Sequence, residues 1–394
     1  PTLAQDLREA TLKSFQNIVN LCLEEKVDFL IVAGDVYDGA DRSIHAQMTF
    51  YEGLNKLAQH GIKSFVAYGN HDPLEGWCSA IEWTDSIHIF ANRVEAVPVA
   101  IKGEPSVLVA GISYQRGKEE RNLAQQFTLP ELNPSDLFKI AVLHCNVAGN
   151  AKHLNYAPCT LNDLTSKRID YWALGHVHEK NILSKNPWVV YPGNSQGRSI
   201  RELGPRGCNV VRINERREVK VDFKPTDVVR WFQESVPIDS VQSVPELIDR
   251  VVKTMNQLMN QSGGRSVVCR LGLVGRGPMY KELSEANQLL DFLNHCRSRL
   301  YRKKPFCWLE QLEFDCMPDV DFEEVRNRND LLSFVLRESD ALRESQLNES
   351  LKPVLEGLFS QHTASRFLTQ YDDAELQKLL KEATLSCFDH LEKD

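Results

Sequence analysis

Four apolar runs in this chain each end in a polar cluster, and this regularity constrains the fold more than any other feature. The runs read D-F-L-I-V-A-G-D-V-Y-D, K-S-F-V-A-Y-G-N-H-D, K-I-A-V-L-H-C-N and D-Y-W-A-L-G-H-V-H. Ligands of α/β sheets collect outside the carboxyl ends of the strands, so we expect the four clusters to meet at one edge of a sheet. The clusters supply Asp35, Asp38, Asn70, His71, His144, His176 and His178.

The chemistry of these side chains predicts a metal centre. Carboxylate and amide oxygens together with imidazole nitrogens suit divalent ions such as Mn²⁺, and two such ions can share a bridging carboxylate. Each cluster also has a plainer interpretation, because Asp after a strand often caps a helix and G-N-H-D can form a tight turn. His176 and His178 point to the same side if their segment is extended, which two surface histidines do not require. The combination therefore favours a dinuclear site.

The rest of the chain indicates three segments. Short apolar runs alternate with helical or loop segments up to about residue 223, which is typical of an α/β domain. We place this domain at residues 1–224, and we interpret the extended stretch 224–237 as a linker. Residues 225–328 hold a small α+β unit with a helix at 281–300, and residues 329–394 form a helical tail that ends in a helix at 373–391. The predicted strands of the first domain lie at 29–32, 64–67, 107–110, 140–143, 171–174, 189–191, 208–213 and 219–223.

Composition excludes several classes of protein. With 42% hydrophobic and 25% charged residues the chain is globular, and its net charge of −8 argues against a generally basic nucleic-acid coat. No apolar run approaches the roughly 18 residues of a membrane span. The ten cysteines include no C-x-x-C pair, so neither a zinc ribbon nor a disulfide framework is indicated. We expect a cytoplasmic protein without a membrane anchor.

Taken in order, G-D-x-x-D, G-N-H-D, an isolated strand-end His and G-H-x-H resemble the signature of the calcineurin-like metallophosphoesterases. The resemblance implies a four-layer αββα sandwich. It also implies that Asp35 bridges two metals, that one metal is completed by Asn70, His144 and His176, and that the other is bound by His178. His71 would lie beside the scissile phosphate, where it stabilises the transition state or protonates the leaving oxygen. Apart from the resemblance, we expect Asp38 to orient either His71 or a metal ligand.

One part of that signature, an opening D-x-H, is absent. Asp6 does not replace it, because its context is D-L-R within an amphipathic segment. We expect that the strand carrying D-x-H precedes Pro1 and that the metal at His178 is weak or missing without it.

Further motifs make the chain similar to the SbcD-like DNA repair exonucleases, in particular the bacterial YhaO-like branch. One such motif is Y-P-G-N-S-Q-G-R-S-I-R-E-L-G-P-R-G-C, and the resemblance is most specific at Gly193 to Glu202. The resemblance implies a nucleoid-associated, Mn²⁺-dependent nuclease, a homodimer formed by the first helices, and an SMC-type (SbcC-like) ATPase that binds the helical tail. The apolar spacing of that tail is equally consistent with packing on its own domain.

A nuclease needs cations that bind the DNA backbone near the metals. Loop arginines supply one set: Arg42, Arg198, Arg201 and Arg206. A second set, at a predicted helix end, comprises Arg297, Arg299, Arg302, Lys303 and Lys304, and these cations equally complement the helix dipole. Two other functions stay open: a phosphoesterase for small nucleotides or phosphoproteins, and a scaffold with an incomplete metal site.

Overall fold

The computed structural model of this chain describes residues 3–38, 43–76, 82–101, 103–128, 137–147, 155–300, 304–344 and 372–391. The chain divides into two units. Unit 1 holds Pro1–Gln233, Gln257–Cys269 and Arg302–Trp308, and unit 2 holds Glu234–Asn256, Arg270–Tyr301 and Leu309–Asp394. Among the described helices, none combines the length and the apolar character that crossing a bilayer requires.

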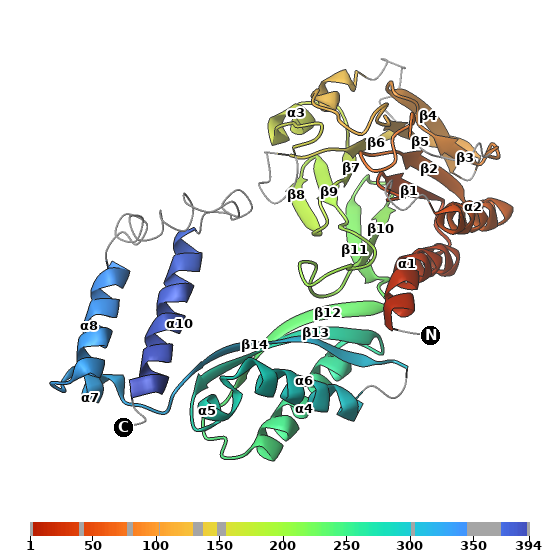
Figure 1. Cartoon of the computed structure of the whole chain (residues 1–394). Helices are drawn as coiled ribbons and strands as arrows, with labels where there is room; N and C mark the ends of the chain where they lie inside the picture. The colour runs from red at the N-terminus through yellow and green to blue at the C-terminus, as the bar shows by residue number, and fades with distance from the viewer. Residues whose placement is uncertain are drawn as a thin grey trace. The chain divides into compact units, whose positions relative to one another are not determined.

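A six-stranded sheet with the order β4-β5-β6-β7-β9-β8 forms the centre of unit 1 (Figure 1). Strands β5, β6, β7 and β9 are parallel, and the outer strands β4 and β8 pair antiparallel with their neighbours. Because β5, β6, β7 and β9 run the same way, their carboxyl ends share one edge, as the sequence predicts. The strands are β4 (Glu95–Ile101), β5 (Glu104–Gly111), β6 (Phe138–His144), β7 (Tyr171–Gly175), β8 (Asn181–Lys185) and β9 (Trp188–Tyr191).

A second sheet of three parallel strands packs on the first. It comprises β1 (Phe29–Ala33), β2 (Lys63–Ala67) and β3 (Ile87–Ile89). Successive side chains of β2 alternate between two cores, since Phe65 faces the six-stranded sheet and Val66 faces the opposite side. The antiparallel hairpin of β10 (Gly207–Ile213) and β11 (Val219–Pro225) packs Val211 and Val221 on the same inner core.

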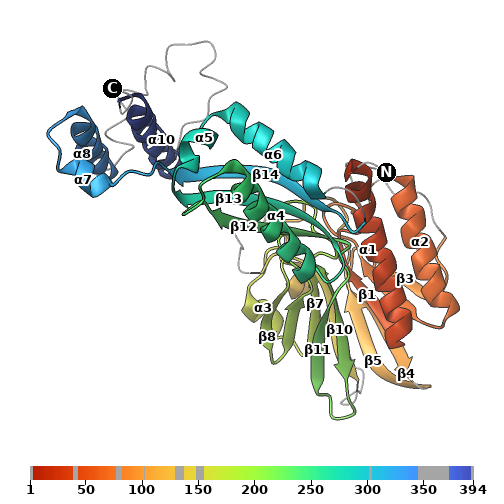
Figure 2. The ribbon, with the colours of Figure 1, turned by 90° about the horizontal axis from the view of Figure 1, so that it is seen from below.

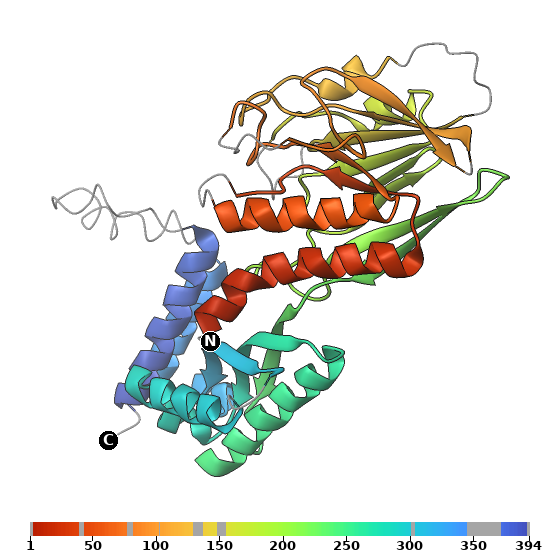
Figure 3. The ribbon, with the colours of Figure 1, turned by 90° about the vertical axis from the view of Figure 1, so that its right-hand side faces the viewer.

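Helices cover both outer faces of the sandwich. Long helices α1 (Leu3–Glu25) and α2 (Ile44–Gln59) run side by side against β1 and β2, and Figures 2 and 3 show both from different sides. The six-stranded sheet is covered by η1 (Leu123–Gln126), α3 (Leu161–Thr165) and the loops around them. The order helix, sheet, sheet, helix confirms the predicted αββα architecture.

The predicted linker at 224–237 is wrong for most of its length. Residues Val229–Pro237 form β12, which belongs to a sheet with the order β12-β13-β14. Val229, Trp231 and Val236 are buried, so these apolar residues belong to a packed strand and not to a spacer. The other strands are β13 (Ser266–Arg276) and β14 (Cys307–Met317).

Helices accompany this sheet. Figure 2 shows α4 (Val244–Gln261) and α6 (Ala286–Leu300) on one face of it. The single helix predicted at 281–300 is two helices, α5 (Met279–Leu283) and α6, because the chain turns between Ser284 and Glu285.

The last described helices of unit 2 share a small core of their own. They are α7 (Phe322–Arg326), α8 (Leu331–Glu344) and α10 (Asp373–Leu391), and Phe322, Leu336 and Phe388 meet in the core. The helix predicted at 373–391 has the bounds of α10. The tail between 345 and 371 lies outside the described residues.

Candidate metal centre

Three of the predicted ligands meet at the carboxyl edge of the two sheets of unit 1. Asp35 follows β1, His144 ends β6 and His176 follows β7, and one ligand atom from each lies within 4.8 Å of the others. His144 Nε2 is 3.2 Å from Asp35 Oδ2 and 3.1 Å from Asn70 Oδ1. The four side chains that the sequence assigns to one metal are thus gathered at one place.

His144 is held rigidly at the bottom of this cluster. Its side chain is 0% exposed, and Nδ1 lies 2.9 Å from the backbone oxygen of Ala33. If Nδ1 carries the proton and donates it to that carbonyl, Nε2 is left as the nitrogen that faces Asp35 and Asn70. The Tyr114 hydroxyl donates to the His144 carbonyl at 2.8 Å, which fixes the strand end itself.

Glycines explain the repeated G-D, G-N-H and G-H patterns. A Cβ on Gly175 would lie 1.8 Å from the Ala33 oxygen, and one on Gly34 would lie 2.5 Å from His144 Nδ1. A Cβ on Gly69 would lie 2.4 Å from Asp35 Oδ1. Only a residue without a side chain lets the neighbouring strand ends approach His144 and Asp35 this closely.

The electrostatics of the cluster are those of a buried ion pair. Burial disfavours the charge of Asp35, but His144, together with the N–H of His71, lowers the pKa of Asp35 to about 2. Burial likewise disfavours the charge of His144, and Asp35 more than offsets it, so the pKa of His144 is raised. A cation bound here would replace the proton that His144 shares with Asp35.

Asp72 is a buried carboxylate to which the sequence assigns no role. Its Oδ1 accepts hydrogen bonds from the N–H groups of Gly69 (2.7 Å) and Asp35 (3.2 Å), and its Oδ2 accepts from Val36 (2.6 Å) and Tyr37 (3.3 Å). Burial, and then the charge of Asp35, raise the pKa of Asp72 to about 6. Asp72 thereby ties the loop after β1 to the loop after β2.

The loop after β7 presents the two histidines of G-H-V-H differently. His176 has a φ of 94°, a left-handed conformation that is strained for a residue with a side chain, and its ring lies 5.2 Å from that of His144. His178 Nδ1 lies 2.6 Å from Glu202 Oε1. A carboxylate on one ring nitrogen is the usual way in which proteins orient a metal-binding imidazole through its other nitrogen.

Sequence reasoning missed Glu202, although it is the last residue of the most specific motif stretch, Gly193 to Glu202. Burial disfavours its charge, but the hydrogen bond with His178 and the N–H of Arg198 lower the pKa of Glu202. Its carboxylate is thus ionised and able to hold His178.

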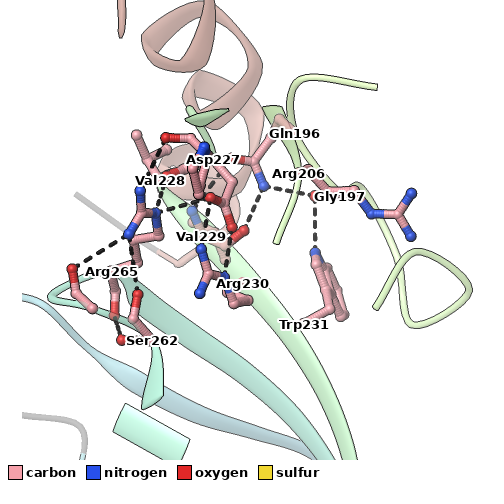
Figure 4. A network of polar contacts seen from close by, with 12 residues as sticks. Gln196, Gly197, Arg206, Asp227, Val228, Val229, Arg230, Trp231, Ser262 and Arg265 are labelled. Atoms are coloured by element: carbon pink, nitrogen blue, oxygen red, sulfur yellow. Dashed lines mark hydrogen bonds and ion pairs between the residues drawn. The ribbon is translucent and has the colours of Figure 1, made fainter. Parts of the chain in front are cut away.

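The sequence predicts that Arg206 binds phosphates. In the structure Arg206 is instead buried in the loop that bears Glu202. Its guanidinium donates to the carbonyls of His178 and Leu203 and to Asn194 Oδ1. Figure 4 shows how the loop is tied to β12: the Gln196 amide bonds the backbone of Val228 and Val229, and the Trp231 indole donates to the Gly197 carbonyl. Arg206 therefore positions the main chain at His178.

Next to the cluster, His71 forms part of a short chain of polar groups. Its backbone N–H donates to Asp35 Oδ1 at 3.0 Å, and its Nδ1 lies 3.6 Å from Asp38 Oδ1. Arg198 donates to Asp38 Oδ2 at 3.0 Å. The His71 side chain is 51% exposed, so it is accessible to a substrate at the metal cluster.

Some of the predicted DNA-contacting cations are exposed in the structure, and others contact protein groups. Arg201 is exposed on the loop that bears Glu202. Lys304 instead forms an ion pair with Asp6 of α1, and the half-buried Arg297 donates to the carbonyls of Leu309 and Glu310. Arg42, Arg302 and Lys303 lie outside the described residues.

The donor set fits a divalent ion. Asp35, Asn70, His144 and His176 offer carboxylate, amide and imidazole atoms, which suit Mn²⁺, Fe²⁺ or Zn²⁺ better than they suit Ca²⁺. The Glu202 contact prepares His178 to be a ligand in the same way.

Comparison with known proteins agrees with this geometry. Residues 6–180 match the model of the calcineurin-like phosphoesterase family, and residues 231–317 match that of the middle domain of the metallophosphoesterase YhaO. The chain is 30% identical over 381 residues to metallophosphoesterase YhaO of Bacillus subtilis, which covers 96% of this chain and 90% of that protein.

More distant relatives are named as DNA double-strand break repair proteins Mre11. The protein from Thermoplasma acidophilum is 26% identical over 54% of this chain and 59% of its own length. The one from Archaeoglobus fulgidus is 28% identical over 48% and 46%. The extent of the match to YhaO shows that this chain belongs to the calcineurin-like metallophosphoesterases of the YhaO family, which are metal-dependent hydrolases.

Proposed function

We propose that this protein is a Mn²⁺-dependent DNA nuclease that acts in DNA repair in the cytoplasm, at the nucleoid. The observation that carries the proposal is the cluster of Asp35, His144 and His176, with Asn70 beside it and His71 exposed at its rim. The relatives named Mre11 support DNA as the substrate. The alternative, hydrolysis of small nucleotides or phosphoproteins, uses the same cluster.

The ligands proposed for two divalent ions are Asp35 between them, Asn70, His144 and His176 on one, and His178 on the other. Such ions, when bound, neutralise charge on the phosphate and lower the pKa of a water molecule. In the protonated form of His71, Asp38 stabilises the imidazolium through Nδ1, and Nε2 carries the proton that the departing oxygen takes up. Arg198 holds Asp38 in place for this role.

The decisive experiment measures cleavage of linear duplex DNA and of a small phosphodiester with Mn²⁺ and with chelator. We expect Mn²⁺-dependent turnover of both, and we expect His71→Ala to abolish both while Mn²⁺ binding is largely kept. Turnover of the small diester without any cleavage of DNA would support the small-substrate alternative. Bound metal without turnover of either substrate would support a scaffold.

Arg201→Gln separates DNA recognition from chemistry. Arg201 is exposed and directly precedes Glu202, the partner of His178, so its loss should weaken DNA cleavage several-fold and leave turnover of the small diester unchanged. Arg93→Gln is the matched control, because Arg93 is 79% exposed and pairs only with Glu95 among the described contacts. Equal loss in both variants would remove Arg201 from the proposed DNA contacts.

We further propose that α8 and α10 bind an SMC-type ATPase and that the first helices form a homodimer. Leu331 and Phe334 on α8 are 59% and 54% exposed, and Ile44 on α2 is 64% exposed. Leu331→Asp with Phe334→Asp should abolish association with the ATPase, and Ile44→Asp should abolish dimerisation in sedimentation. Leu290→Asp on α6, which is 53% exposed, is the control for both.

A further inference from the structure

A basic pocket lies at the opposite end of the six-stranded sheet from the metal cluster. It has a volume of about 520 Å³ and is lined at the first residues of β6 and β9, at the segment that leads into β7, and at the turn between β10 and β11. The candidate metal ligands follow the carboxyl ends of β6 and β7, whereas this pocket is at their amino ends. It is therefore separate from the site described above.

The lining of this pocket is strongly cationic. Five basic residues contribute to it, and among its described residues Asp170 is the single carboxylate. Asp170 is paired with Arg217 at 2.8 Å. In the part of the chain that the structure describes, none of the remaining four cations lies within ion-pair distance of a carboxylate. The four are Lys139, Lys167, Arg168 and Lys185.

Two of these four cations have contacts that leave their charge in place. The Lys185 ammonium lies 6.0 Å from the centre of the Trp188 ring. The Lys167 ammonium donates to the Gln125 carbonyl at 3.1 Å. Carbonyls and aromatic rings orient a cation without neutralising it. The pocket thus gathers four positive charges that lie outside ion-pair distance of any described carboxylate.

This concentration is unusual for a chain with a net charge of −8. Several other cations of unit 1 pair with acids, as Arg212 does with Glu25 and Asp222. Cations that converge on a hollow without acidic partners repel one another, and an anion in the hollow relieves that repulsion. Phosphate suits such a site, because it accepts charge-assisted hydrogen bonds on several oxygens.

We propose that the pocket binds the phosphate of a small phosphorylated ligand of the mononucleotide class. A volume of about 520 Å³ is that of a small-molecule site, and the lining includes the aromatic residues Phe138 and Trp188 beside the cations. A DNA backbone would instead need cations spaced along a track, whereas these surround one hollow. The inference is independent of the proposed nuclease activity.

Calorimetric titration of the full chain with deoxyadenosine monophosphate, and separately with inorganic phosphate, tests this proposal. A chelator in the buffer keeps metal ions off the cluster of Asp35, His144 and His176, so that they cannot contribute to binding of either probe. Replacing Arg168 and Lys185, both exposed in the pocket, by Gln should weaken binding about tenfold or more. The double variant Arg93→Gln and Lys118→Gln loses the same charge elsewhere on unit 1 and should bind as the wild type does.

Tighter binding of the nucleotide than of phosphate would support a nucleotide site, and equal binding would support free phosphate as the natural source of the same chemistry. The proposal is overturned if neither probe binds, if both double variants weaken binding equally, or if only duplex DNA depends on Arg168 and Lys185. Loss of nuclease activity does not enter any of these outcomes.

Discussion

Asp72 fixes the loops that carry two of the proposed metal ligands, although it is not itself one of these ligands. Its two oxygens accept four backbone N–H groups from the loops after β1 and β2. Since its side chain is almost completely buried, water cannot replace it as the acceptor. The conformation of Asp35, whose φ is 55°, therefore depends on a residue 37 positions further along the chain.

Asp72→Ala should lower the free energy of unfolding by about 2 to 4 kcal/mol, because buried N–H groups would lose their acceptor. Denaturation in urea measures this change, and a Mn²⁺ titration should show weaker binding in the same variant. Asp249→Ala on the exposed side of α4 is the control and should leave both unchanged. A fully stable Asp72→Ala protein would mean that the loops can find other acceptors.

Glu202→Gln tests whether orientation of His178 matters for metal binding. The amide can still accept from the Arg198 N–H, but it no longer offers a carboxylate to His178 Nδ1. We expect Mn²⁺ affinity to fall about 10- to 100-fold, as measured by calorimetric titration without substrate. Glu179→Gln removes an exposed neighbouring charge and should have no effect. Unchanged affinity in Glu202→Gln would mean that Glu202 stabilises its own loop and does not affect metal binding.

At the scale of elements, the sequence was most informative where a strand is buried on both faces. β6 and β7 are nearly continuous apolar runs, so they could be predicted closely. In contrast, β4 contains Pro98 and β8 reads N-I-L-S-K, and these outer strands carry too little apolar pattern to be found.

The same division holds for the candidate site. The cluster of Asp35, His144 and His176 could be predicted because each residue lies at or just after the end of a strand. Glu202 lies within a recognised motif, but its contact with His178, 24 residues away, has no signal in the sequence. Asp72 was visible in the motif, but its function depends on two loops that only the folded chain brings together. Predicted boundaries failed at β12 because Pro225 and Pro237 flank the strand and suggested a linker.

Gly175→Ala tests the close approach of β1 and β7. The new Cβ would lie 1.8 Å from the Ala33 oxygen, so one strand end must shift, and we expect a loss of about 3 kcal/mol or more in unfolding free energy. Gly272→Ala in β13 is the matched control, since its Cβ would meet nothing closer than 4.0 Å. Similar thermal unfolding of the two variants would contradict the tight packing inferred here.

At the scale of the whole molecule, charge and chemistry are unevenly distributed along the chain. All the described candidate metal ligands belong to unit 1, as does the basic pocket at the amino ends of its strands. The described helices α7, α8 and α10 belong to unit 2 and contribute no ligand to the metal cluster. A metal that binds only the native state of unit 1 stabilises that unit in proportion to its affinity.

Hydrogen exchange read by mass spectrometry can follow this stabilisation along the chain. Mn²⁺ should slow exchange at the amides after β1, β2, β6 and β7, because opening of those loops requires release of the ion. The amides of α8 and α10 should exchange at the same rate with and without Mn²⁺, and Asp35→Asn should abolish the protection in unit 1. Protection that arises equally in α8 would place a Mn²⁺ site, or a strong coupling, outside the cluster of Asp35, His144 and His176. Protection confined to the loops after these strands would instead place the bound Mn²⁺ at the cluster of Asp35, His144 and His176. This conclusion would not depend on any measurement of activity.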